Sequence, residues 1–224
     1  MDGQHIRLVK VEGCMSFSED FPAFFNLKQK IICYRNYGDW KHRGYYFIHI
    51  PKNAGTSLCH ALGLPDPGHC LNKGRSKEDE LFTFTIVRDP AVRLYSIYRY
   101  SKKPIFDHWR TSLHFMRKYD SYDDFVINWV NKVELSKYYF FRPQVEYVKD
   151  SEGDICLDLM IRFESLQEGM EELSKRIGIE INLPRLNVSK QDFVGDNRSS
   201  SIVSNIIYEK YKMDYELLGY SPEK

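Results

Sequence analysis

The chain has 224 residues, of which 42% are hydrophobic and 15% aromatic, a composition that fits one globular domain and excludes an intrinsically disordered chain. Its formal net charge is +1, so nothing in the overall charge attracts nucleic acid, and any anion must be bound locally. The sequence contains neither an apolar run of about 18 residues nor a signal-peptide pattern, from which we expect a cytoplasmic protein without a membrane span.

The cysteines are few and irregularly spaced. There are five, at positions 14, 33, 59, 70 and 156, and no two form a CxxC pair. An odd number without paired spacing predicts neither a disulfide framework nor a zinc site, and it favours a reducing compartment. The sequence shows no other group of metal ligands, so we expect no metal.

The first part of the chain leads into a short buried strand. Residues 1–43 read as an irregular N-terminal segment with a short helix around 22–33, and residues 44–224 read as the main domain. The β-prone run YYFIHI predicts a strand over 45–50. A turn and a helix from Ser57 follow it, and then a polar loop rich in Pro and Gly over residues 65–80.

A second strand is predicted where FTFTIV spans residues 82–87. Asp89 is a good helix N-cap and Pro90 suits the first helical position, so a helix should run from there to about residue 101. The remaining predicted elements are an amphipathic helix over 122–134, a strand over 157–163, and helices over 166–177 and 200–218.

Strands that alternate with helices predict an α/β domain with a mostly parallel central sheet flanked by helices. Ligands of such sheets bind beyond the carboxyl ends of the strands. The two turns that follow the first two strands are therefore the places to search for a site.

The first turn, residues 51–57 (PKNAGTS), has the composition of an anion site. Free N–H groups at a helix start attract negative charge, Gly55 lets the backbone approach a ligand, and Lys52 adds a positive charge. Thr56 and Ser57 add hydroxyl donors. The alternative is a plain connection in which Thr56 or Ser57 serves as N-cap.

The second turn begins at Arg88, at the predicted end of its strand. Its guanidinium should reach the same crevice as Lys52. Arg93 and Ser96 share a face of the following helix, and a guanidinium with a hydroxyl suits a second phosphate. The alternative is that Arg88 pairs with a carboxylate and Ser96 merely faces neighbours within its helix.

Together, FIHIPKNAGTSL at residues 47–58 and FTIVRDPAVRLYSIY at residues 84–98 resemble the paired signature of the sulfotransferases, particularly the carbohydrate-type branch. The similarity covers roughly residues 45–220 and continues more weakly through 141–144 (FRPQ) and 162–164 (RFE).

The resemblance implies a single domain with a P-loop NTPase-like sulfotransferase fold. It also implies the donor 3′-phosphoadenosine 5′-phosphosulfate (PAPS), and no metal. In the family the first element binds the 5′-phosphosulfate and the second binds the 3′-phosphate. Asn53 stands where relatives usually have Thr, and its amide can still donate a hydrogen bond. The donor-binding residues implied are Lys52, Asn53, Ala54, Gly55, Thr56, Ser57, Arg88 and Ser96.

Sulfuryl transfer to a hydroxyl or amine requires a general base as well as Lys52, which would neutralise the leaving phosphate. The candidate is His69 in the loop between the two turns, where related carbohydrate sulfotransferases often have a Gly-His pair. His49 and His60 are expected to be structural. Reserve candidates are His108, His114, Glu146 and Glu164, the last expected to fix structure. Aromatic and basic residues over 98–118 suit a saccharide acceptor, although an exposed basic helix and loop would look the same.

Two other functions remain open on the sequence alone. A nucleotide kinase would share the architecture, but the order of residues in 51–57 is not that of the G-x-x-x-x-G-K-[ST] loop. A non-catalytic module that binds PAPS or sulfated ligands would keep Lys52 and Arg88 and lack the base.

Overall fold

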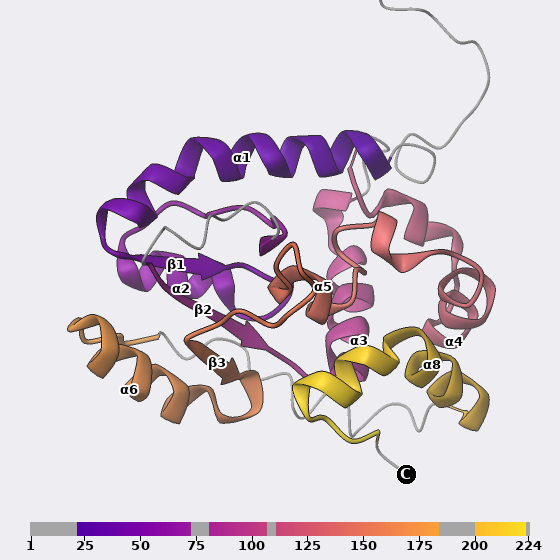
Figure 1. The fold of residues 1–224 in the computed structure, drawn as a ribbon. Coiled ribbons are helices and arrows are strands. Elements are labelled where there is room, and N and C mark those ends of the chain that lie inside the picture. Colours follow the sequence, from indigo (N-terminus) through magenta and orange to yellow (C-terminus); the bar gives the residue numbers. More distant parts are fainter. Residues whose placement is uncertain (1–21, 73–80, 107–110, 184–199, 223–224) are drawn as a thin grey trace, which may run out of the picture.

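A computed structural model describes residues 22–72, 81–106, 111–183 and 200–222. A parallel sheet of three strands lies at its centre, in the order β1 (Tyr45–Ile48), β2 (Phe82–Val87) and β3 (Leu159–Arg162). Helices flank this sheet (Figure 1), which confirms the predicted single α/β domain with a parallel sheet.

The register of the strands brings the two turns to one edge of the sheet. Ile48, the last residue of β1, pairs with Thr85 of β2. Val87, the last residue of β2, pairs with Arg162 of β3. The strands are parallel, so the segments that follow β1 and β2 leave from the same edge.

The helix predicted around residues 22–33 is confirmed and is longer than expected, because α1 (Pro22–His42) continues through residues that we had predicted to be irregular. It lies along the sheet (Figure 1), where Trp40 is fully buried with its ring centroid 5.8 Å from that of Phe47. Leu27 and Tyr34 on the same helix are largely exposed. Apolar residues thus occur on more than one side of α1, which hides the stripe that would mark a surface helix.

The helices next to the sheet begin largely as predicted. Asp89 caps α3 (Pro90–Ser101), since its Oδ1 accepts a hydrogen bond from Val92 N–H at 2.9 Å. The side chain of Ser200 likewise caps α8 (Ser201–Leu218). The remaining helices next to the sheet are α2 (Gly55–Leu62) and α6 (Leu166–Ile177), the latter preceded by the 3-10 turn η6 (Phe163–Ser165).

Short helical pieces fill the space between α3 and β3. The predicted single helix over residues 122–134 is wrong, because α4 (Tyr122–Phe125) runs into a π-helical stretch, η4 (Val126–Val130). Aromatic rings pack a second core there, with Phe125 and Trp129 stacked at 5.3 Å. The other pieces are η2 (Pro104–Phe106), η3 (His114–Lys118), η5 (Leu135–Lys137) and α5 (Gln144–Val148).

A disulfide joins Cys33 of α1 to Cys70 in the loop after α2. The expectation that the cysteines form no disulfide is therefore wrong, and the argument for a reducing compartment loses its basis. The pairing escaped the sequence because 37 positions separate the two residues and only the packing of α1 brings them together.

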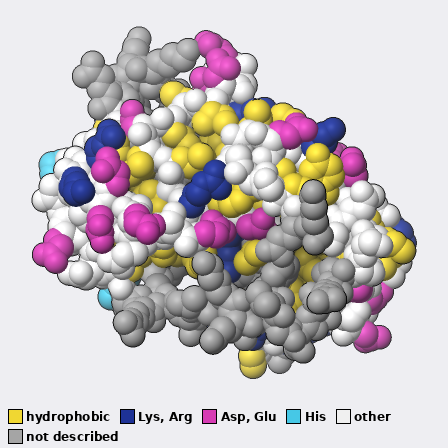
Figure 2. Space-filling model, turned by 90° about the horizontal axis from the view of Figure 1, so that it is seen from below, with side chains coloured by type: hydrophobic (Ala, Val, Ile, Leu, Met, Phe, Trp, Pro, Cys, Tyr) yellow, Lys and Arg dark blue, Asp and Glu magenta, His cyan; other side chains and the backbone are white. Residues whose placement is uncertain are grey.

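The described surface carries no large region of one charge in the view of Figure 2, where acidic and basic side chains are interspersed around hydrophobic ones. This agrees with the formal net charge of +1. Every helix in the described part of the chain is too short or too polar to cross a bilayer.

Candidate functional site

A cleft of about 1510 Å³ opens at the carboxyl edge of the sheet. It exceeds the roughly 300–1,000 Å³ of ordinary small-molecule pockets and leaves room for two ligands side by side. All the predicted site residues except Asn53 line this cleft, namely Lys52, Ala54, Gly55, Thr56, Ser57, His69, Arg88 and Ser96.

The turn after β1 directs the start of α2 into the cleft. Lys52 and Ala54 both have left-handed backbone conformations, with φ of 70° and 61°. Ala54 occupies the N-cap position and provides no side-chain cap. The alternative with Thr56 or Ser57 as N-cap is therefore wrong. The Ser57 N–H donates to the Ala54 carbonyl at 3.1 Å, so the N–H groups of Gly55 and Thr56 are the ones at the start of α2 that can bind an anion.

Gly55 is required by its contact with the protein itself. A Cβ atom at this position would lie 2.1 Å from the His49 ring. That ring cannot easily move away, because its Nδ1 is bonded to Oδ1 of Asp66 at 2.8 Å. The sequence predicted a glycine here for close approach to a ligand. The structure adds a second reason, which is that a side chain at this position would collide with His49.

The side chain of Asn53 points into the interior, which corrects the expectation that its amide contacts a ligand. It is 1% exposed, and its Nδ2 donates to the Ile86 carbonyl at 2.8 Å and to Oε1 of Gln144 at 2.7 Å. Asn53 thus ties the first turn to its neighbours.

Lys52 lies within the cleft with its ammonium 3.9 Å from the ring centre of Tyr100. Burial lowers its pKa to about 8, and the positive charges of Lys103 and Arg88 contribute. Lys52, Lys103 and Arg88 thus place three cations in the wall of one cleft, which suits a multiply charged anion.

Arg88 is also buried, at 4% exposure, and its guanidinium stacks on the Phe163 ring at 4.1 Å. Its Nη1 lies 3.5 Å from the Lys52 carbonyl, so the two turns meet here. Glu164 fixes structure as expected, because its carboxylate accepts from Asp89 N–H at 2.8 Å and from the Tyr220 hydroxyl at 3.0 Å.

The spacing predicted that Arg93 and Ser96 would face a ligand together, but Arg93 points into the interior. It is 1% exposed and donates to three backbone carbonyls. These belong to Pro51 at 3.1 Å, Arg142 at 3.0 Å and Phe140 at 2.9 Å. Arg93 therefore holds the start of the first turn through its bond to the Pro51 carbonyl.

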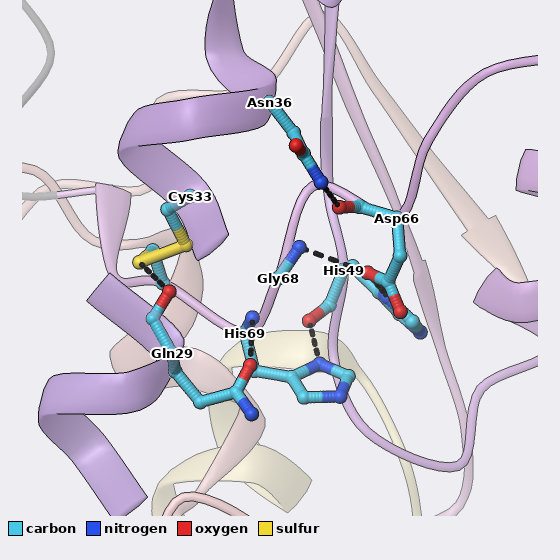
Figure 3. Close-up of a disulfide and its surroundings, with 8 residues drawn as sticks. Gln29, Cys33, Asn36, His49, Asp66, Gly68 and His69 are labelled. Atoms are coloured by element: carbon cyan, nitrogen blue, oxygen red, sulfur yellow. Dashed lines mark hydrogen bonds and ion pairs between the residues drawn. A yellow bond between two sulfur atoms is a disulfide. The ribbon is translucent and has the colours of Figure 1, made fainter. Parts of the chain in front are cut away.

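His69 lies in the cleft wall, and the surrounding contacts fix its orientation. Its Nδ1 bonds to the His49 carbonyl at 2.8 Å, and its backbone N–H donates to Oε1 of Gln29 on α1 at 3.1 Å (Figure 3). A carbonyl only accepts hydrogen bonds, so Nδ1 carries the proton and Nε2 is left as a basic atom. Burial lowers the pKa of His69 to about 3 in the free protein, and the neighbouring His49 adds to this.

Asp66 connects this loop to His49. The same Oδ1 that accepts from His49 also accepts from Gly68 N–H at 2.8 Å, and the Asp66 carbonyl accepts from Asn36 of α1 at 2.7 Å (Figure 3). Burial alone would raise the pKa of the Asp66 carboxyl, but these hydrogen bonds and the imidazoles of His49 and His69 lower it below its usual range.

His49, Asp66 and His69 form a group of potential metal ligands that the sequence did not suggest, with one ligand atom of each within 4.8 Å of the others. Both imidazole Nδ1 atoms already have protein partners, on Asp66 and on the His49 carbonyl. These bonds fix the orientation of both rings and leave the two Nε2 atoms as the nitrogens that could bind a further group.

The reserve candidates His114 and Glu146, like His60, lie away from the cleft. His60, which we expected to be structural, is exposed on α2. His114 bonds through Nδ1 to the Phe106 carbonyl at 3.0 Å, and Glu146 lies 3.8 Å from Arg142. None of these three lines the described cleft, and His108 lies outside the described residues.

Sequence reasoning missed the buried contacts made by Gln144 and Asp214, which are both fully buried. Gln144 Oε1 accepts from Asn53 Nδ2 and from Arg88 N–H, while its Nε2 donates to the Arg88 carbonyl. Asp214 of α8 accepts from the backbone N–H groups of Gln144 and Val145, each at 2.8 Å. Gln144 had appeared only as the last residue of the FRPQ similarity.

Comparison with known protein families identifies one match, to the sulfotransferase family over residues 69–221. The match covers more than half of the chain and includes the second turn, β3 and α8. The chain belongs to the sulfotransferase family. No curated protein and no solved structure matches it.

The family match begins at residue 69 and thus after the first turn. The assignment of Lys52 and the start of α2 to the donor site therefore depends on their position in the cleft shared with Arg88 and Ser96.

Proposed function

We propose that this member of the sulfotransferase family transfers a sulfuryl group from PAPS to a hydroxyl or amine of a saccharide. The observation that carries the proposal is the meeting of two turns in one cleft: Lys52 and the start of α2 line it together with Arg88 and Ser96. A donor with phosphate groups at both the 5′ and 3′ positions needs two such anion sites.

The first turn would hold the 5′-phosphosulfate. The free N–H groups at the start of α2 and the hydroxyls of Thr56 and Ser57 would bond its oxygens. The ammonium of Lys52 is already desolvated, so its interaction with an anion is stronger than it would be in water. The second turn, with Arg88 and Ser96, would hold the 3′-phosphate.

Transfer proceeds in line. The acceptor oxygen or nitrogen forms a bond to sulfur while the bond from sulfur to the bridging phosphate oxygen breaks, and adenosine 3′,5′-bisphosphate leaves with the electron pair. Lys52 neutralises the charge that grows on that oxygen. Nε2 of His69 accepts the proton of the acceptor.

The low pKa of His69, about 3 in the free protein, keeps Nε2 unprotonated before substrates bind. Bound phosphosulfate would bring negative charge next to the ring and raise this pKa toward the working range of a general base.

The acceptor end of the cleft suits a saccharide. Tyr100, Phe140 and His69 line it, and the ring of Tyr139 stacks on His69 at 5.6 Å. Flat aromatic faces pack against sugar rings, and Lys103 in the same wall can hold an acidic substituent.

Calorimetric titration with adenosine 3′,5′-bisphosphate tests the donor. We expect it to bind more tightly than 5′-AMP, and Arg88→Ala should weaken it by about 2–3 kcal/mol, the scale of a lost charged hydrogen bond, while changing 5′-AMP far less. Equal binding of the two nucleotides would sink the donor assignment. Mass analysis of saccharides incubated with PAPS then tests the acceptor.

A further inference from the structure

The side chain of Gln144 connects the two phosphate-binding turns directly. Its Oε1 accepts from Asn53 Nδ2 at 2.7 Å and from Arg88 N–H at 3.0 Å. Its Nε2 donates to the Arg88 carbonyl at 2.7 Å. One amide group therefore holds both Asn53, in the first turn, and Arg88, in the second.

This connection lies just beyond the last backbone pairing between β1 and β2. The pairing of β1 with β2 ends at Ile48 and Thr85, so backbone ladder bonds fix the strands only up to that point. Beyond it, the bond from Asn53 to the Ile86 carbonyl and the bridge through Gln144 join the turns in the interior. The side chains of Arg88 and Arg93 add contacts to the carbonyls of the first turn.

The bridge formed by Asn53, Gln144 and Arg88 N–H is buried, and Asp214 of α8 anchors Gln144. Gln144 and Asp214 are both 0% exposed, and Asn53 is 1% exposed. Asp214 accepts the backbone N–H of Gln144 at 2.8 Å, and its Oδ2 lies 3.4 Å from Gln144 Nε2. Both polar atoms of the Gln144 amide have buried partners, and such bonds hold the groups that they join in one geometry.

Only a primary amide of this length fits. The Oε1 atom must accept twice, and Nε2 must donate to a carbonyl. Glutamate would place a second carboxylate against Asp214. An apolar side chain would remove one of the two acceptors of Asn53 Nδ2 and the amide partner of the Arg88 backbone groups.

We propose that Gln144 is a positioning residue that sets the distance between the 5′-phosphosulfate site and the 3′-phosphate site, and thereby the preference for a 3′,5′-bisphosphorylated nucleotide. This inference rests on the proposed donor. A ligand that spans both turns needs their separation to be correct, whereas a monophosphate uses one turn and tolerates a change in spacing.

The test measures the affinities of adenosine 3′,5′-bisphosphate, 5′-AMP and 3′-AMP by calorimetry on the whole chain. In Gln144→Met, binding of the bisphosphate should weaken about tenfold or more, while each monophosphate changes by less than about threefold. Asn53→Ala removes the bridge from the other end and should show the same selective loss, so it carries the test if Gln144→Met does not fold.

Tyr211→Phe is the matched control. It deletes a buried hydrogen bond, from the Tyr211 hydroxyl to the Phe141 carbonyl at 2.8 Å, without touching either turn. Its ratio of affinities should equal that of the unmodified protein.

Equal weakening of all three nucleotides, or an unchanged ratio in both variants, would overturn the role of Gln144. Failure of the unmodified protein to prefer the bisphosphate would instead overturn the proposed donor, and this inference with it. The nucleotide preference of the unmodified protein therefore tells the two failures apart.

Discussion

Loss of the disulfide between Cys33 and Cys70 should destabilise the protein strongly. The bond closes a loop of 37 positions, and the chain entropy removed from the unfolded state by such a loop corresponds to about 4 kcal/mol. For a chain of this size, that loss should lower the midpoint of thermal unfolding by about 8–16 °C.

The measurement is denaturant unfolding of the unmodified protein and of Cys33→Ser with Cys70→Ser, each with and without reductant. The double variant should lose about 4 kcal/mol in free energy of unfolding, and reductant should bring the unmodified protein to the same value. Cys156→Ser provides the matched control, because Cys156 is exposed and forms no disulfide, and this variant should unfold as the unmodified protein does.

The same reduction should affect the proposed base. Cys70 follows His69 directly, and α1 holds that loop through Cys33 and through Gln29, whose Oε1 accepts from His69 N–H. Turnover should therefore fall more than the affinity for adenosine 3′,5′-bisphosphate. A reduced protein as stable as the oxidised one would refute the reasoning, as would the finding of free thiols at both cysteines in the purified protein.

Three further predictions concern the cleft. Burial lowers the pKa of Lys52 to about 8, and the proposed donor site needs this ammonium charged. Affinity for adenosine 3′,5′-bisphosphate should therefore fall about tenfold per pH unit above that value, and Lys52→Arg should remove the dependence. Burial lowers the pKa of His69 to about 3, and bound donor should raise it, so the acidic limb of the kcat profile should lie at higher pH than that of kcat/KM. His69→Ala should bind adenosine 3′,5′-bisphosphate normally and lose turnover. Acidic limbs at the same pH in both profiles would argue against His69 as the base. Gly55→Ala should cost about 1–3 kcal/mol of stability by overpacking against His49, and His49→Ala in the same chain should recover part of it, as denaturant unfolding would measure.

Much of the fold was predictable because its signals are local. The buried runs at β1 and β2 and the cap at Asp89 each lie within a few residues, and the structure has them where the sequence placed them. The helix α2 was also predicted, although it begins at Gly55, two residues before the predicted start. The α/β alternation then requires the two turns to share a sheet edge. The cleft follows from that topology.

The errors arose where the decisive contacts are far apart in the sequence. Asn53 looked like a ligand-facing donor because its bonds to Ile86 and Gln144 become visible only when three segments meet. The buried carboxylate of Asp214 did leave a signal, since it interrupts the apolar spacing of Ile207, Tyr211 and Leu218 on α8, all nearly fully buried. A charge on a buried stripe predicts a bonded partner.

The two halves of the proposed chemistry are supported by different parts of the chain. The bridge at Gln144, anchored by Asp214 of α8, holds the donor turns, while α1 holds the loop of His69 through Gln29 and Cys33. Perturbation of the bridge should therefore impair donor binding, and reduction of the disulfide should impair proton transfer. If each perturbation instead reduced both functions equally, the cleft would act as one rigid unit and the division between α1 and α8 would have no functional meaning. Measuring nucleotide affinity and turnover on both perturbed forms decides between these cases, because only independent supports give opposite patterns of loss.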